Sequence, residues 1–199
     1  MAGLTLLLET DEGTYLRRVP DASPLPAVEA QGYEAEAAVR DAAATWGMPD
    51  FLFLPRQQRK GKGVREIGDG LLVVGNQAAG LQVKSRTDPC DNPDKEKRWL
   101  DKAIAKALSQ GDGTVRRLTN TPAVLENARG REVLVDGAAH EWLSVVIVDH
   151  ASLPRDFFPA ESTSSAPSVV LTRRDWEFLF LPPTALDPSR AGLPAPHGR

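Results

Sequence analysis

The chain has 199 residues, an apolar fraction of 41% and a formal net charge of −3. This length suits one domain of ordinary size, and the apolar content excludes wholesale disorder. No apolar run approaches the ~20 residues that span a bilayer, and "GLTLLL" is too short for a secretory signal. We therefore expect no membrane association and a cytoplasmic location. The single cysteine, Cys90, excludes an intramolecular disulfide and a cluster of thiolate zinc ligands.

Charge is unevenly distributed along the chain. Residues 56–117 hold 14 Lys+Arg against 8 Asp+Glu, a balance of +6, whereas the rest of the chain is at −9 (10 basic, 19 acidic). A basic stretch within an acidic protein predicts a face that binds a polyanion. The alternative is a set of solvated lysines on the outer side of a helix.

The first half of the chain predicts short strands, one helix and a hairpin. Two strands are expected at residues 4–8 and 15–19, and an Ala- and Glu-rich helix over residues 27–47. A buried strand, "DFLFLP", precedes a basic loop, "RQQRKGKGVR". The apolar runs "GLLVV" and "GLQVKS" then predict a β-hairpin around "GNQAAG".

A second helix is predicted from about Asp94 to Gln110. Asn92 suits its N-cap, Pro93 suits its first position, and "GDG" is expected to end it. Its lysines lie largely off the apolar side, so this helix is expected to be amphipathic. The apolar stripe consists of Trp99, Ala103, Ile104, Ala107 and Leu108.

The second half predicts further strands. "TVRRL" begins a short element, and "REVLVDG" and "EWLSVVIVDH" are strands, the latter apolar enough to be central. "VVLTRRDWEFLFLPP" predicts a strand followed by a helix start, and residues 183–199 predict a flexible Pro/Gly/Ala-rich tail. This order of elements predicts an α/β fold with a mixed central β-sheet flanked by helices. We expect a single domain over residues 1–182, with its core at about 27–150.

Polar residues stand at the ends of the two hairpin strands. Alternation places Gln82 and Lys84 on one face, and strand pairing would bring Asp69 near them. A carboxylate, an amide oxygen, the backbone carbonyl of Val83 and an ammonium would then converge. Such oxygen donors suit Mg²⁺ or Mn²⁺ beside a phosphate. A neighbouring lysine can orient water or neutralise charge on the phosphate, so the set predicts phosphodiester hydrolysis.

These residues resemble the core of the PD-(D/E)xK, or restriction-endonuclease-like, nuclease superfamily, in the QxK form of Mrr-type and RecB-type nuclease domains. The resemblance covers about residues 50–118 and rests on "ExxDG", two apolar strands, "QVKSR" and an amphipathic helix with Trp. It implies a mixed four-stranded sheet flanked by helices, Asp69 and Gln82 as metal ligands, and Lys84 as the catalytic lysine. Gln82 departs from the acidic pattern, which weakens metal binding and leaves a degenerate, inactive member as an alternative.

The resemblance also implies a glutamate near the metal and nucleic-acid contacts around it. Glu66 is the candidate glutamate, with Glu34 and Glu36 of the Ala-rich helix as alternatives. A glutamine of the following helix lies near the site in RecB-like members, and Gln110 corresponds to it. The candidate nucleic-acid-binding residues are Arg59, Lys60, Lys62, Arg65, Arg86, Gln110, Arg116 and Arg117.

Structural roles compete with these assignments. Asp69 with the next glycine is a common turn pair, and Lys84 suits the guard of an edge strand. Trp99 and Trp142 are expected in the core, and His150 with its neighbouring aspartate suits the end of a strand.

The leading hypothesis is a metal-dependent nuclease that hydrolyses DNA phosphodiester bonds with Mg²⁺ or Mn²⁺. Its substrate could be single-stranded DNA or DNA ends, and a homodimer or a partner protein could supply specificity. The alternative is a non-catalytic nucleic-acid-binding or protein-interaction module on a degenerate nuclease fold. No P-loop, dinucleotide fingerprint or serine elbow is present, so ATP, NAD and acyl-transfer chemistry have no support.

Overall fold

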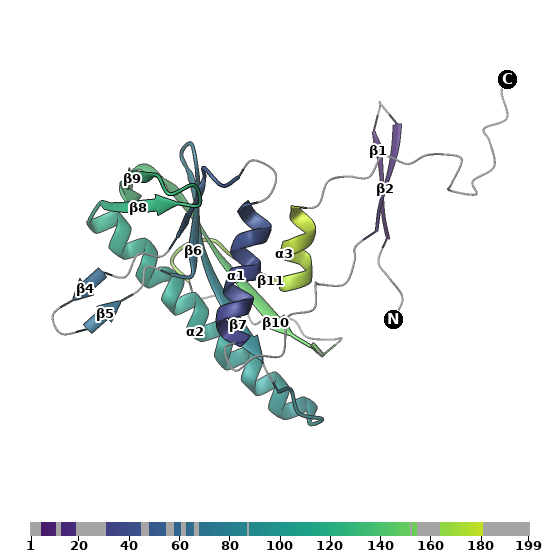
Figure 1. Cartoon of the computed structure of the whole chain (residues 1–199). Helices are drawn as coiled ribbons and strands as arrows, with labels where there is room; N and C mark the ends of the chain where they lie inside the picture. Colours follow the sequence, from purple (N-terminus) through teal and green to yellow (C-terminus); the bar gives the residue numbers. More distant parts are fainter. Residues whose placement is uncertain are drawn as a thin grey trace, which may run out of the picture.

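Most of the predicted elements belong to one mixed sheet and its helices in the computed structural model (Figure 1). The structure describes residues 5–10, 13–18, 31–44, 48–54, 58–60, 63–65, 68–86, 88–151, 153–154 and 164–180. The tail predicted for residues 183–199 lies outside this part of the chain.

Two hairpins form small sheets of their own. β1 (Thr5–Thr10) pairs with β2 (Gly13–Arg18), and β4 (Gln58–Lys60) pairs with β5 (Gly63–Arg65), both antiparallel. The second hairpin corrects the loop predicted for residues 56–65. Polar composition suggested a loop, but strand pairing satisfies backbone N–H and C=O groups whatever the side chains.

Seven strands form the central sheet in the order β11-β10-β7-β6-β3-β8-β9. β7, β10 and β11 run parallel to one another, whereas the remaining neighbours are antiparallel. The predicted α/β fold with a mixed central sheet is therefore confirmed. The strands are β3 (Leu52–Leu54), β6 (Gly70–Val74), β7 (Gln77–Arg86), β8 (Ala123–Asn127), β9 (Glu132–Val135), β10 (Glu141–His150) and β11 (Ser168–Thr172).

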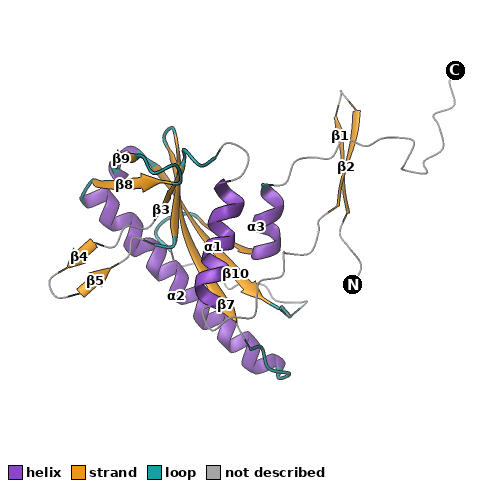
Figure 2. Ribbon diagram, viewed as in Figure 1, coloured by secondary structure: helices purple, strands orange, loops and turns teal. Residues whose placement is uncertain are grey.

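Helices cover the two faces of this sheet (Figure 2). α1 (Gln31–Ala44) and α3 (Arg173–Leu179) pack together on one face, and α2 (Pro93–Asn120) crosses the other. A short 3₁₀ turn, η1 (Gly137–Ala139), packs against α2. None of the described helices combines the length and the apolar composition that a bilayer span requires.

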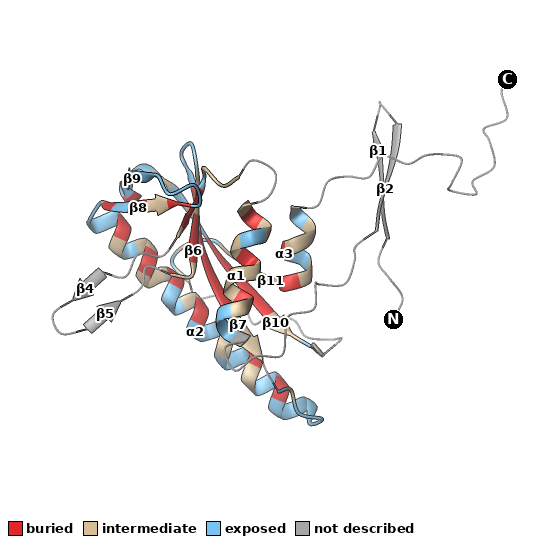
Figure 3. Ribbon diagram, in the orientation of Figure 1, coloured by how far each residue is buried: buried red, intermediate tan, exposed pale blue. Residues whose placement is uncertain are grey.

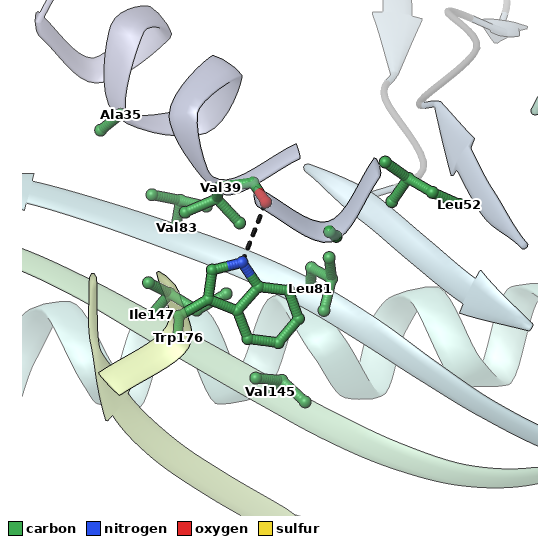
Figure 4. Packing of buried hydrophobic residues seen from close by; sticks show 9 residues of the cluster. Ala35, Val39, Leu52, Leu81, Val83, Val145, Ile147 and Trp176 are labelled. Atoms are coloured by element: carbon green, nitrogen blue, oxygen red, sulfur yellow. Dashed lines mark hydrogen bonds between the residues drawn. The ribbon is translucent and has the colours of Figure 1, made fainter. Parts of the chain in front are cut away.

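The core beneath α1 and α3 is built around Trp176 (Figure 4). Its indole N–H donates a hydrogen bond of 2.9 Å to the carbonyl oxygen of Val39 in α1. The ring packs over the apolar side chains that β7 and β10 present to this face, among them Val83 and Ile147. Alternation along β7 therefore places Leu81 and Val83 here, and Gln82 and Lys84 on the opposite face, as predicted.

The core beneath α2 contains two clusters. Near the start of the helix, Leu100, Ile104 and Ala107 pack on the valines of β10. Near its end, Leu118 packs with side chains of β3, β6, β8 and β9. Figure 3 shows the buried residues following the central strands and the inner side of α2. The helix thus spans the sheet from β10 to β8 and β9.

α2 is a single helix of 28 residues, which corrects the expected stop at residues 111–113. Its predicted start is confirmed, because the Asn92 side chain accepts a hydrogen bond of 3.1 Å from the Lys95 N–H. A Cβ at Gly111 would overlap Ser144 Oγ of β10. Gly111 therefore allows close packing of the helix on the sheet, and this tertiary contact outweighs its poor helix propensity.

Two details of the strands differ from the prediction. The hairpin turn is shorter, because Val74 pairs with Gln77 and Gly75 takes a left-handed φ of +58° between them. This conformation suits a two-residue turn. β8 was not predicted, because its sequence "AVLEN" is short and carries only three apolar residues. β10 has the bounds that its apolar run predicted.

Candidate functional site

Asp69 lies where β6 begins and contacts β7 through its backbone and its side chain. Its N–H donates to the carbonyl oxygen of Leu81 at 3.1 Å, and its Oδ2 accepts from the Val83 N–H at 2.6 Å. β6 begins at Gly70, which pairs with Leu81, so Val83 lies beyond the part of β7 that pairs with β6. The Asp69 carboxylate takes the place of a strand partner there, and it therefore lies beside residues 82–84.

Gln82 is buried more deeply than is expected of a metal ligand at a site open to substrate. It is 2% exposed, and its Nε2 has no hydrogen-bond partner among the described residues. Gly68, with φ of +67°, passes so close that a Cβ there would lie 2.9 Å from this nitrogen. The nearest hydroxyl of α2 at this point belongs to Thr114. The amide of Gln82 is thus enclosed between the sheet, α2 and the segment leading to Asp69.

Lys84 is half-buried, and its Nζ donates a hydrogen bond of 3.1 Å to the carbonyl oxygen of Val83. The pKa of its ammonium lies below the ordinary value, chiefly because burial disfavours the charged form. The charge of Lys106 in α2 lowers the pKa further, whereas Asp69 and Glu36 oppose this shift. The charges of Asp69, Glu36 and Lys106 therefore all act on the Lys84 ammonium.

Glu36 and Lys106 belong to helices on opposite faces of the sheet, α1 and α2. Glu36 belongs to α1, where Arg40 lies 3.7 Å from its carboxylate. The charge of Glu36 acts on Lys84, and Glu66 lies outside the described residues. The sequence analysis did not select Lys106, although its position one turn before Gln110 on the polar side of α2 was a usable signal.

The donors at this site fit a hard cation in part. Asp69 places a carboxylate beside Lys84, and the charge of Glu36 acts on the same lysine. Mg²⁺ needs only one or two carboxylates when water and phosphate oxygens complete its shell. Against this, the described residues contain no group of three or more His, Cys, Asp or Glu side chains that could hold a metal ion. The Val83 carbonyl oxygen, a predicted ligand, already accepts from Lys84. The fit therefore depends on the two carboxylates.

A second cluster lies at the end of β7, around Glu96 of α2. Its Oε1 accepts hydrogen bonds from Arg86 Nη2 and the Cys90 N–H, both at 2.9 Å. Its Oε2 accepts from Arg86 Nε at 3.2 Å and lies 2.8 Å from His150 Nε2. The pKa of Glu96 is strongly lowered, first by the hydrogen bond from Arg86 and then by that from Cys90. Sequence analysis missed Glu96, because helical periodicity shows nothing of its partners on two strands.

Two tryptophans and Asp149, considered in the sequence analysis, have structural contacts. Trp99, expected in the core, is only partly buried and packs near Arg86 and His150. Trp142 is also partly buried, and its N–H donates to the η1 turn. Asp149 accepts a hydrogen bond of 2.8 Å from Arg173 Nε. These contacts agree with strand-end and packing roles.

The other predicted nucleic-acid-binding residues are distributed over two elements. Arg59, Lys60 and Arg65 lie in the β4–β5 hairpin, whereas Lys62 lies outside the described residues. Along α2, Gln110 and Arg116 are exposed and Arg117 is half-buried. Among these candidates, Arg86 contacts the second cluster, through its hydrogen bonds to Glu96.

Comparison of the chain with protein-family models, with curated proteins and with solved structures gave no match.

Proposed function

We propose that this protein is a metal-dependent nuclease that hydrolyses DNA phosphodiester bonds. The observation that carries the proposal is the position of Asp69, whose carboxylate lies 2.6 Å from the Val83 N–H beside Lys84. Glu36 and Lys106 act on the same lysine. Carboxylates and ammonium groups around one point suit a divalent cation and a phosphate together.

In this proposal each side chain has a separate task. Asp69 and Glu36 would hold Mg²⁺ or Mn²⁺, which supplies a Lewis acid for the phosphate oxygens and for water. The Lys84 ammonium would neutralise charge that develops on the phosphate, and Lys106 would add a second cation. The Gln82 amide would complete the set through its oxygen.

The arrangement of elements supports the restriction-endonuclease-like core that the sequence resembles. β3, β6, β7 and β10 form four neighbouring strands of mixed direction between α1 and α2. The proposed acid and lysine stand on the two middle strands of this group, as the resemblance implies. A homodimer would allow cleavage of both strands of a duplex.

The alternative is a non-catalytic nucleic-acid-binding module, and the burial of Gln82 favours it. A side chain that is 2% exposed must move or hydrate before its oxygen can reach a cation. In such a module the basic side chains of α2 would bind phosphates without turnover, and binding would weaken steeply with salt.

The first experiment measures cleavage of plasmid and single-stranded DNA with Mg²⁺ or Mn²⁺. We expect Lys84→Ala and Asp69→Asn each to lower the rate by about 10²-fold or more, because the first removes the cation beside the phosphate and the second removes the charge of a metal ligand. Lys97→Ala is the matched control, because Lys97 is an exposed lysine of α2 paired with Asp101. Removal of the metal with EDTA should abolish cleavage.

Calorimetric titration with Mn²⁺ separates the two functions. The nuclease requires heat of binding that Asp69→Asn reduces. Equal cleavage by wild type, Lys84→Ala and Asp69→Asn would contradict the proposal. Salt-dependent DNA binding without metal-dependent turnover would favour the binding module.

A further inference from the structure

Arg86 presents one edge of its guanidinium to Glu96 and leaves the other edge available. Nε and Nη2 donate to the two oxygens of Glu96, at 3.2 and 2.9 Å. Nη1 donates no hydrogen bond to any described residue, and the side chain is 27% exposed. A guanidinium has five N–H donors in a fixed plane, so donors remain for a further oxyanion.

Glu96 is itself held rigidly. It is 3% exposed, and its carboxylate accepts hydrogen bonds from Arg86 and from the Cys90 N–H. His150 Nε2 lies 2.8 Å from its Oε2. The His150 side chain is fully buried, so neither partner of this contact is free to rotate into solvent. A carboxylate with this many partners has a fixed orientation, and so has the guanidinium bound to it.

Trp99 restricts the remaining freedom of Arg86. The guanidinium carbon lies 5.3 Å from the centroid of the Trp99 ring, within the range of a cation–π contact. His150 lies on the same indole, with ring centroids 5.8 Å apart. Arg86 is thus held at one edge by a carboxylate and bounded by an aromatic ring.

The position of Arg86 relates it to the proposed site. Arg86 follows Lys84 by two residues in β7, so both side chains leave the same face of the sheet, roughly 7 Å apart along the strand. This separation is comparable to that of successive phosphates in an extended nucleic-acid strand. Both residues lie at the carboxyl ends of the parallel strands β7 and β10, where open α/β sheets bind ligands.

We propose that Arg86 binds a backbone phosphate next to the phosphate at Lys84, and that Glu96 is the positioning residue that orients the guanidinium for it. The proposal rests on the proposed function, because the ligand is the same nucleic-acid strand. It assigns to the protein a second phosphate contact outside the reacting centre, in the form of a preorganised arginine fork.

The competing explanation is a structural ion pair that fastens the start of α2 to β7. Both explanations predict some loss of stability on substitution, because truncation would leave Glu96 buried with fewer partners. They differ in binding. A structural pair leaves DNA affinity unchanged in any folded variant, whereas a phosphate contact contributes to the salt dependence of binding.

The test is fluorescence anisotropy of a labelled single-stranded oligonucleotide, measured in EDTA over a range of KCl concentrations. We expect Arg86→Ala to weaken binding about tenfold and to reduce the slope of log K against log[KCl] by roughly 0.7, the value for one phosphate contact on a single strand. The matched control is Arg131→Ala, which removes an arginine that is 74% exposed next to Asp50, outside the cluster. The control should bind within about twofold of wild type.

Glu96→Gln separates positioning from charge. This change makes the protein more positive, so simple electrostatics predicts tighter binding, whereas loss of positioning predicts weaker binding with the slope retained. Arg86→Lys keeps the charge but not the fork, and it too should bind more weakly. Thermal unfolding would show which variants are folded.

Two results would overturn the proposal: folded Arg86 variants that bind like Arg131→Ala, or tighter binding by Glu96→Gln. If Arg86→Ala does not fold, an Arg86→Lys variant that binds DNA with wild-type affinity overturns the proposal. The assay needs no cleavage, so Arg86-dependent binding without turnover supports the subsite and rejects the nuclease. If neither cleavage nor DNA binding changes on substitution of Arg86, the Arg86 phosphate contact is rejected and the nuclease proposal is retained.

Discussion

Glu96 shows how one buried carboxylate depends on its neighbours. With 3% of its surface exposed, it keeps its charge because Arg86, the Cys90 N–H and His150 surround it. These hydrogen bonds favour the ionised form and lower its pKa below the ordinary value near 4.3. In the unfolded chain the same carboxyl has no such partners, so the two states bind protons differently.

The first prediction concerns acid stability. Because the pKa of Glu96 is lowered in the folded state, its contribution is present above about pH 4.3 and is lost as the pH falls below that value. We expect the unfolding temperature of wild type to fall more steeply than that of Glu96→Gln between about pH 5 and pH 3. Asp101→Asn, which alters a surface pair with Lys97, should leave the wild-type profile nearly unchanged. Parallel profiles for wild type and Glu96→Gln would contradict this account.

At the scale of elements, α2 is the segment in which local signals and tertiary packing disagree. Residues 111–113 favour the end of a helix, yet the helix continues to Asn120. Gly111 lies against Ser144, where a side chain has no room. A Cβ added at Gly113 would meet no atom within 4 Å. The two glycines therefore have different roles in one helix.

The second prediction compares these two glycines. Gly113→Ala should stabilise the protein by about 0.5–1 kcal/mol, because alanine has the better helix propensity and meets nothing. Gly111→Ala gains the same propensity but forces Ser144 away, so we expect a net loss of about 1–2 kcal/mol. Urea unfolding of both variants measures the difference. Equal stabilisation by both changes would show that α2 does not pack closely on β10.

At the scale of the whole molecule, the α1 face of the sheet is covered by two helices that are distant in sequence. α1 and α3 meet through Trp176, whose N–H donates to the Val39 carbonyl oxygen 137 residues away in the chain. The same core packs on β7, the strand that contains Lys84, through Leu81 and Val83 (Figure 4). The packing of α1 and α3 on the sheet therefore helps to fix β7, the strand that contains Lys84.

The third prediction tests that contact. Trp176→Phe removes the hydrogen bond and part of the buried ring, and we expect a loss of about 1–3 kcal/mol in the free energy of unfolding. Leu179→Ala is the control on the same helix, because Leu179 is 58% exposed and should change stability little. A loss equal to that of the control would mean that α3 contributes little to the core.

Elements with strong local signals were predictable from the sequence. The Asn92–Pro93 start of α2, the apolar run of β10 and the alternation that separates Gln82 and Lys84 from Val83 all agree with the structure. Each signal depends on a residue and its near neighbours in the chain, through capping, continuous burial or the two-residue period of a strand.

Other features depend on segments that meet only in the folded chain. The continuation of α2 through Gly111, the order of the seven strands, the burial of Gln82 and the partners of Glu96 were all decided by tertiary structure. The sequence by itself determined which residues were polar at the ends of the hairpin strands. It did not determine which charges would act on Lys84, because Glu36 and Lys106 come from helices on opposite faces. Their approach depends on long-range packing, which local patterns do not encode.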